Sequence, residues 1–303
     1  MNSLRHPRVL VPFLVATIIW GSTWLVIRDQ LGVVPPTWSV AYRFLIASAA
    51  MFGWALITRA PLSIGRDGQI FAVLLGFAQF VLNFNFVYRA EEHITSGLVA
   101  VLFALLLVPN ALIARAFLGG VFTGRFLIGA AVAMAGVAML IVQEIRADPS
   151  SASATWLGAG LTLAGVLSAS VANVMQGTRR ARALPMASML AWAMLWGGLI
   201  NVAIAWPTVG APIVETRPFY WLGTLYLGIF ASAVAFTCYF AVIRAVGPAV
   251  AAYSSVLTPI LAMLLSTLFE DYRWSWLAGA GGVVALSGLL IALSAPRPAT
   301  KSG

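Results

Sequence analysis

The sequence predicts an all-α polytopic membrane protein with ten transmembrane helices. Of its 303 residues, 61% are apolar and only 9% are charged, a composition that no soluble domain of this size could keep hydrated. Ten apolar runs follow one another, each near the ~20 residues that a helix needs to cross ~30 Å of hydrocarbon. The runs are continuous rather than alternating, which favours helices over a β-barrel.

Five of the runs precede the longest polar break in the chain. They cover residues 10 to 27, 37 to 57, 69 to 88, 94 to 114 and 124 to 143. The first follows two arginines and could be taken for a signal peptide, but no small-residue cleavage site precedes the segment IIWGSTW, so we expect a retained helix. The fourth contains Pro109, which is expected to kink its helix. The fifth carries Gly129 and Gly136, which would let a neighbouring helix approach closely.

The other five runs follow the break and repeat these features. They cover residues 156 to 177, 186 to 206, 218 to 242, 248 to 268 and 275 to 294. The ninth contains Pro259, and the tenth contains Gly281 and Gly288, at about 150 residues from their counterparts. The only cysteine, Cys238, lies within the eighth run, so no intramolecular disulfide can form.

The repetition divides the chain into two halves. We expect a first five-helix repeat over residues 1–143, a connecting outer loop over 144–155, and a second repeat over 156–303 that ends in a short cytoplasmic tail. Because five is an odd number, the second copy would enter the membrane inverted. Inverted repeats place a substrate site near the midplane between the halves and allow either side to open in turn.

The basic residues set the expected orientation. With the N-terminus inside and ten spans, twelve Arg and Lys residues fall on the inner side and five on the outer side. This distribution obeys the positive-inside rule, so both termini are predicted to be cytoplasmic. The formal charge of +9 therefore belongs mainly to the inner membrane surface, and nucleic acid is not an expected partner.

Several motifs resemble those of a known family. They are WGSTWLVI in the first helix, YRFLIA in the second, and the proline and two glycines that end each half. Over roughly residues 10 to 294, the set resembles the drug/metabolite transporter superfamily, specifically the ten-helix proteins with two EamA repeats. The resemblance implies a basket-shaped bundle with a central cavity, in a family whose bacterial members export amino acids and related metabolites. Within it, the sequence looks most like the YddG-type amino-acid exporters.

The sequence offers little for catalysis or metal binding. His6 and His93 are the only histidines, and no pattern of a metal site or an activated nucleophile occurs. We therefore expect no enzyme activity, no metal and no cofactor. No carboxylate lies in the middle of a predicted span, which favours facilitated transport over proton coupling. Glu91, Glu92, His93 and Glu270 at the outer rim are the only alternative groups for proton coupling, and we expect them to be solvated loop residues.

Uncharged polar and aromatic residues are the candidates for a substrate path. Gln79 and Asn83 share one face of the third helix, and Asn173 lies on a similar stripe of the sixth. Because an unpaired amide is costly in hydrocarbon, these faces should meet either neighbouring helices or a wet cavity. The further candidates are Trp20, Trp24, Tyr88, Tyr253 and Ser254. Pro109 and Pro259 are candidate gating elements, with a plain packing kink as the alternative.

Arg43 is the only charged residue well inside a predicted span. If its helix starts near Thr37, Arg43 lies only about 9 Å deep, so its side chain could snorkel to the outer surface. Alternatively, it faces the cavity and offers two parallel hydrogen bonds to a carboxylate, the group that all amino acids share. The sequence leaves both interpretations open.

The sequence and the resemblance together lead to one expected function. The protein would be a monomeric, multi-pass transporter of the bacterial inner membrane, in contact with membrane lipid and a small-molecule substrate. It would export amino acids, including aromatic and other neutral ones, or related small metabolites by alternating access. An exporter of drugs or nucleobase-like compounds, with or without proton coupling, is the alternative within transporters. A channel, an intramembrane enzyme or a lipid-handling subunit is a further alternative.

Overall fold

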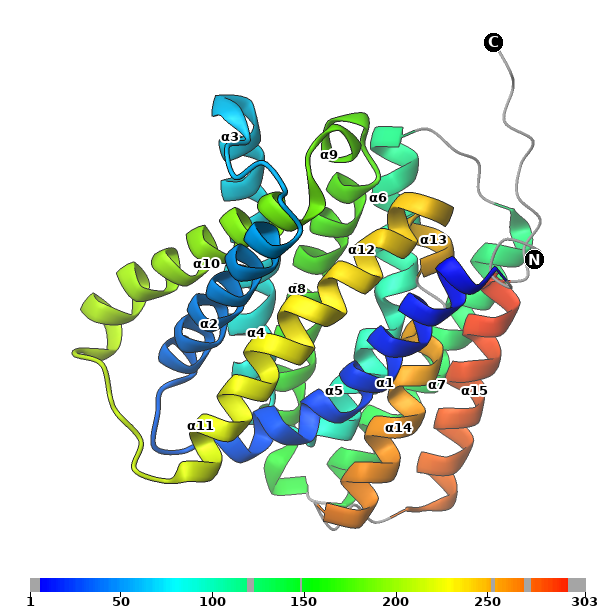
Figure 1. Ribbon diagram of the computed structural model, residues 1–303. Coiled ribbons are helices and arrows are strands. Elements are labelled where there is room, and N and C mark those ends of the chain that lie inside the picture. Colours follow the sequence, from blue (N-terminus) through cyan, green and yellow to red (C-terminus); the bar gives the residue numbers. More distant parts are fainter. Residues whose placement is uncertain (1–5, 119–122, 148, 252–253, 270–273, 294–303) are drawn as a thin grey trace.

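The structure is a computed structural model that describes residues 6 to 293 except 119 to 122, 148, 252 to 253 and 270 to 273. In these residues every regular element is helical. Figure 1 shows one bundle of long helices in which α1 begins and α15 ends at the same end of the bundle. We call this end the N-terminal side and the opposite end the far side.

The first half of the chain forms five helical segments. The first, second and fifth segments are the single helices α1 (Pro7–Gln30), α2 (Pro36–Ile57) and α7 (Gly124–Ala147). The third segment is continuous and consists of α3 (Gly65–Gly76), the π-helical η1 (Phe77–Asn83) and α4 (Phe84–Ala90). The fourth consists of α5 (Ser96–Phe103), the 3₁₀ turn η2 (Ala104–Leu106) and α6 (Leu107–Leu118). The turn η2 lies immediately before the turn that contains Pro109. Because a proline cannot donate to the carbonyl one turn earlier, a departure from α-helical geometry is expected here, where the sequence predicts a kink.

The second half follows the same order. A short 3₁₀ turn, η3 (Pro149–Ser151), leads into α8 (Ala152–Gln176), the short α9 (Arg179–Ala183) and α10 (Met186–Val209). Next come α11 (Pro218–Leu225), the π-helical η4 (Tyr226–Val234) and α12 (Ala235–Val246), which are continuous, then α13 (Pro248–Ala251), α14 (Ser254–Phe269) and α15 (Trp276–Leu293). Prolines begin α1, α2, α11 and α13, where a missing backbone N–H costs no helical hydrogen bond.

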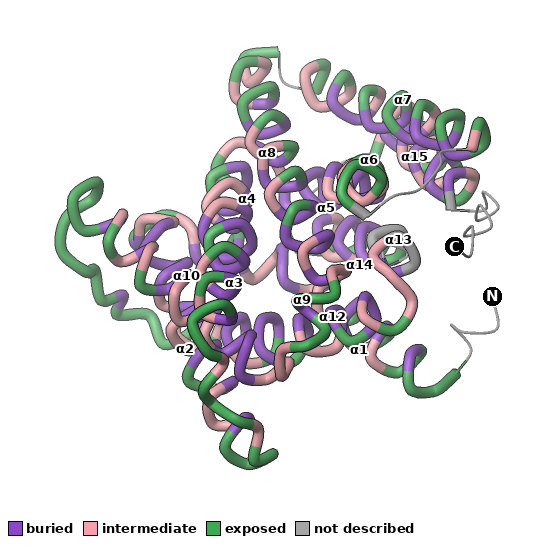
Figure 2. Tube along the Cα trace, turned by 90° about the horizontal axis from the view of Figure 1, so that it is seen from above, coloured by how far each residue is buried: buried purple, intermediate pink, exposed green. Residues whose placement is uncertain are grey.

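Eight of the ten expected spans are long and apolar enough to cross a membrane within the described residues. The ninth and tenth correspond to two shorter apolar helices, Leu257–Phe269 and Trp276–Ala292. Figure 2 shows that the exposed residues lie on the outer faces of the helices and the buried ones face inward. Many exposed residues are large and apolar, among them Phe117, Leu157 and Phe219. A bilayer would cover such a surface.

Two helix pairs form opposite edges of the bundle. Figure 1 shows α2 beside α10 at one edge and α7 beside α15 at the other, and both pairs are in extensive contact. A Cβ atom added to Gly129 or Gly136 on α7 would overlap the backbone of Ala292 or Ala285 on α15. The close approach expected from these glycines is therefore confirmed, and it is made between the last helices of the two halves.

Candidate functional site

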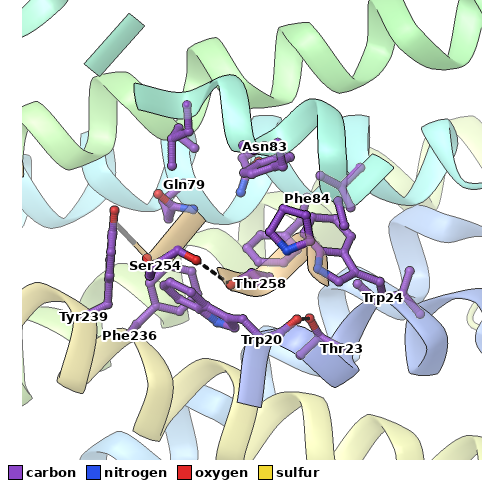
Figure 3. Close-up of a pocket in the computed structure, with 18 of the residues that line it drawn as sticks. Trp20, Thr23, Trp24, Gln79, Asn83, Phe84, Phe236, Tyr239, Ser254 and Thr258 are labelled. Carbon is purple, nitrogen blue, oxygen red and sulfur yellow. Dashed lines mark hydrogen bonds between the residues drawn. The ribbon is translucent and has the colours of Figure 1, made fainter. Parts of the chain in front are cut away.

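A cavity lies among helices of both halves, as Figure 3 shows. Its empty volume is about 730 Å³, including the part that is open to solvent. The lining is mainly aromatic and aliphatic. Its polar members are one arginine, three amides and several hydroxyl groups, and no acidic residue is among them.

Seven of the nine candidate path residues line this one cavity. They are Trp20, Trp24, Arg43, Gln79, Asn83, Asn173 and Ser254. Tyr88 is fully buried but lies outside the lining, and Tyr253 lies outside the described residues. Of the two prolines, Pro259 lines the cavity, whereas Pro109 does not.

An aromatic wall forms one part of the lining. The Trp20 ring packs edge-on against Phe236 and Tyr239, with centroids 5.2 and 4.8 Å away, and Figure 3 shows the three side by side. The Trp20 indole N–H donates to the Ala231 carbonyl at 3.0 Å. Because this bond fixes the ring and satisfies its only polar atom, Trp20 presents an apolar surface to the cavity.

Arg43 is buried, with 1% of its surface exposed, so the snorkelling interpretation is wrong. Its Nε donates to the Ser232 hydroxyl at 2.9 Å, and its guanidinium carbon lies 4.3 Å from the centre of the Phe84 ring. The Tyr88 hydroxyl and the Glu91 carboxylate interact with it electrostatically. Its Nη1 has no hydrogen-bond partner among the described residues. The contacts with Ser232 and Phe84 thus hold the guanidinium cation at the wall of the cavity.

The amides lie at two levels of the cavity. Gln79 and Asn83 belong to the π-helical segment η1, and both are almost fully buried. The side-chain oxygen of each accepts no hydrogen bond from the described residues. Asn173 on α8 donates to Asn110 on α6 at 3.4 Å. Each amide can both donate and accept, so a polar ligand could replace the missing partners.

Sequence reasoning missed the two π-helical segments. They occupy equivalent places in the two halves, about 150 residues apart, and both contribute to the site. The segment η1 carries Gln79 and Asn83, while η4 carries the acceptors of Trp20 and Arg43, Ala231 and Ser232. Such segments are rare and frequently occur at functional sites. We find no signal in the sequence that specifies them.

Sequence reasoning also missed several further lining residues. Phe84, Phe236 and Thr258 all contribute side chains to the cavity. Phe84 follows Asn83 directly and Thr258 precedes Pro259, so proximity to a candidate was an available signal for both. Phe236 is three residues before Tyr239, one turn away on the same helix face.

A layer of buried hydrogen bonds lies at the far side, about one turn beyond the lining residues Ile27 on α1 and Arg43 on α2. Gln30 accepts from the Tyr88 hydroxyl at 3.0 Å and donates to the Thr224 hydroxyl at 2.7 Å. Ser39 and Tyr220 pair through their hydroxyl groups at 2.8 Å. The residues of this far-side layer, Gln30, Ser39, Tyr88, Tyr220 and Thr224, are each at most 1% exposed. The layer therefore joins α1, α2, α4 and α11 across the far end of the cavity.

Glu91 departs from its expected place. A solvated carboxylate was expected, but Glu91 has none of its surface exposed. Glu91 directly follows α4, and the Arg28 side chain of α1 donates to the Glu91 carbonyl oxygen there. The neighbouring Glu92 is exposed as expected. Glu270 lies outside the described residues.

A polytopic helical bundle that encloses an amphipathic cavity between its halves has the architecture of a small-molecule transporter. Comparison with known proteins agrees with this class. The model of the EamA-like transporter family matches residues 8–142 and again residues 155–294. The chain belongs to this family.

Several curated proteins are similar over most of their length. The inner membrane transporter YedA of Escherichia coli, described as uncharacterized, is 30% identical over 283 residues, covering 91% of this chain and 88% of that protein. Protein PagO of Salmonella typhimurium is 24% identical over 294 residues, covering 96% and 93%. A solved crystal structure superposes with a TM-score of 0.71 at 20% identity, covering 95% of this chain and 98% of the other. That last likeness concerns the fold alone.

Proposed function

We propose that this EamA-family protein is an exporter of neutral amino acids, aromatic ones included, in the bacterial inner membrane. It would work as a monomer with ten spans in two inverted five-helix repeats and with both termini in the cytoplasm. The single observation that carries the proposal is Arg43. A buried guanidinium whose Nη1 has no partner among the described residues, in a cavity with no acidic residue in its described lining, attracts a carboxylate and disfavours a purely cationic compound.

The remaining lining suits the rest of an amino acid. The amide oxygens of Gln79, Asn83 and Asn173 can accept from an ammonium group. The wall around Trp20 can contact an apolar or aromatic side chain. The cavity thus offers one group for each part of a zwitterion.

The far-side layer supports alternating access. Its buried hydrogen bonds close the cavity at the end that the charge distribution assigns to the outside. The cavity lining extends the other way to Asn173 and Ser254, which lie at helix ends on the N-terminal side. We infer that this conformation receives substrate from the cytoplasm, and that Pro109, Pro259 and the π-helical segments accommodate the change to the outward-facing one.

Facilitated transport fits the cavity better than proton coupling, because none of the described residues that line it is Asp, Glu or His. The buried Glu91 is the group on which a proton-coupled cycle would depend. The aromatic wall also favours a second candidate function, the export of flat nucleobase-like or drug-like compounds. Competition by uncharged aromatic compounds that lack a carboxylate would separate this candidate from the first.

The test is counterflow in liposomes. Purified protein is reconstituted with unlabelled amino acids inside and a labelled amino acid outside, and the proton gradient is collapsed. Saturable exchange that several neutral amino acids inhibit is expected. Folded protein that shows no exchange would remove the amino-acid proposal and favour the nucleobase-like substrates, whereas exchange that requires a restored gradient would remove the facilitated mechanism.

A further inference from the structure

Two tryptophans on one face of α1 differ in their hydrogen bonding. The Trp20 indole N–H donates to the Ala231 carbonyl at 3.0 Å. The Trp24 indole N–H is buried and has no partner among the described residues, although Trp24 lines the same cavity and its ring lies 5.4 Å from that of Phe103. A buried donor without an acceptor is costly and therefore uncommon in a native structure. Trp24 thus holds a donor that the protein itself does not use.

Arg43 holds the second such donor. Its Nε is used by Ser232 and one face of its guanidinium by Phe84, which leaves Nη1 without a partner among the described residues. Trp24 lies six residues before the far-side end of α1, and Arg43 lies seven residues after the far-side start of α2. At 1.5 Å per residue, both are about 10 Å from the far side. The two residues that carry the unused donors therefore lie at similar distances from the far-side ends of their helices.

The apolar wall is displaced from them along the cavity. Trp20 is one turn closer to the N-terminal side than Trp24, and Tyr239 lies only seven residues before the end of α12 on that side. Figure 3 shows Trp20, Phe236 and Tyr239 on one side of the cavity and Trp24 with Phe84 on the other. The cavity is thus polarised, with a pair of donors towards the far side and aromatic surface towards the N-terminal side.

We propose that Trp24 is a specificity-determining residue whose indole N–H, together with Arg43, binds the substrate carboxylate. This inference rests on the proposed function and goes beyond it by fixing the orientation of the substrate. The carboxylate points to the far side, and the side chain points to the wall formed by Trp20, Phe236 and Tyr239. A carboxylate has enough lone pairs to accept from both donors at once.

The experiment compares Trp24→Phe with the matched variant Trp20→Phe, since both keep a ring and remove one N–H. Counterflow of labelled L-phenylalanine is measured with L-phenylalanine and L-phenylalaninamide as competitors. Trp24→Phe should weaken competition by phenylalanine about tenfold, the effect of losing a hydrogen bond to a charged group, and should weaken the amide less. Trp20→Phe should weaken both competitors by one common factor. The inference would be overturned if Trp24→Phe weakened competition by phenylalanine and by its amide equally, or if it weakened neither.

Stability without substrate gives a second, independent reading. Trp20→Phe leaves the Ala231 carbonyl without its donor and should lower the melting temperature more than Trp24→Phe, which breaks no protein hydrogen bond. An equal loss in Trp24→Phe would mean that its N–H has a structural role and would overturn the inference. If the unmodified protein exchanges no amino acid, the proposed function fails first and the inference falls with it, whereas normal exchange with an unchanged Trp24→Phe profile removes only the inference.

Discussion

At the scale of single residues, Arg43 shows how a membrane bundle keeps a cation. A guanidinium in hydrocarbon is costly unless partners replace its hydration. Ser232 lies 189 residues away in the sequence and accepts from Nε, while Phe84 stacks on the guanidinium. Since Nη1 then has no partner in the part of the chain that the structure describes, the same arrangement that makes the charge tolerable also keeps one donor for a ligand.

We predict that Arg43→Lys and Arg43→Gln both reduce the rate of amino-acid counterflow about tenfold or more at a substrate concentration below KM. Lysine keeps the charge but offers neither the planar fork nor the stacking surface that Phe84 contacts. Immunoblots of the membrane fraction should show normal amounts of both variants. The control is Arg125→Gln, because Arg125 is exposed at the start of α7. Full transport by Arg43→Lys would show that a point charge is sufficient.

A second residue-scale prediction concerns Glu215 in the far-side loop between α10 and α11. Its carboxylate accepts from the backbone N–H of Arg217 at 3.2 Å and of Thr216 at 2.9 Å, and it pairs with the Arg217 guanidinium at 3.3 Å. These bonds, the one from the Arg217 backbone most of all, lower the pKa of Glu215 below its ordinary value of 4.5. A lowered pKa stabilises the loop above pH 4.5, and this stabilisation is lost as the pH falls through the folded-state pKa.

Glu215→Gln should therefore speed hydrogen exchange at the Thr216 and Arg217 amides near neutral pH. After correction for intrinsic exchange rates, the difference from the unmodified protein should shrink as the pH falls well below 4.5. Hydrogen–deuterium exchange with mass spectrometry measures both. A difference that persists unchanged at low pH would assign the effect to packing instead of charge.

At the scale of elements, the sequence predicts the helices better than the site. Hydropathy locates the spans, and the four-residue spacing of Gln79 and Asn83 correctly places both side chains in one cavity. The partners of Arg43 and the burial of Glu91 depend on helices that are distant in sequence, so no local pattern encodes them. The π-helical segment η1 begins directly after a close contact between helices, since a Cβ atom at Gly76 would overlap the Ala193 carbonyl of α10.

The contact between α7 and α15 gives an element-scale prediction. Gly136→Ala should destabilise the protein, because the added methyl group overlaps the backbone of Ala285 and must push the helices apart. Gly160→Ala is the matched control, since an added Cβ has no neighbour within 4 Å at this position of α8. It should be neutral or stabilise by up to ~1 kcal/mol, the usual gain in a helix. Thermal unfolding of the purified variants in detergent measures both, and equal melting temperatures would contradict the close packing.

At the scale of the whole molecule, the cavity and the far-side layer are linked through shared residues. Tyr88 belongs to the layer through its bond to Gln30 and also interacts with Arg43 in the cavity. A carboxylate that binds Arg43 would compete with the interactions of Tyr88 and Glu91 with the same guanidinium. Substrate binding would then weaken the layer that closes the far side. In such a scheme the substrate favours opening of the far side only if it binds the open conformation more tightly than the closed one.

The last prediction tests this link through the accessibility of a cysteine. With Cys238 replaced by serine and Ile27 by cysteine, the new thiol lies on the cavity lining one turn before the layer. A membrane-impermeant thiol reagent should label it from the N-terminal side and poorly from the far side. Adding Gln30→Leu removes the bonds to Tyr88 and Thr224, which together stabilise the closed state by ~1–3 kcal/mol. The rate of labelling from the far side should then rise about tenfold. In protein that keeps Gln30, added phenylalanine should also raise the rate of labelling from the far side.

The control for this measurement is a cysteine at Val214, which is 72% exposed in the far-side loop. It should react from the far side at the same rate in both backgrounds, because it lies outside the layer. Reaction of the Ile27→Cys thiol from the far side before Gln30 is changed would show that the layer does not close the cavity. Reaction of the Val214→Cys thiol only from the cytoplasmic face of oriented vesicles would instead reverse the proposed orientation, because the charge distribution places this loop outside.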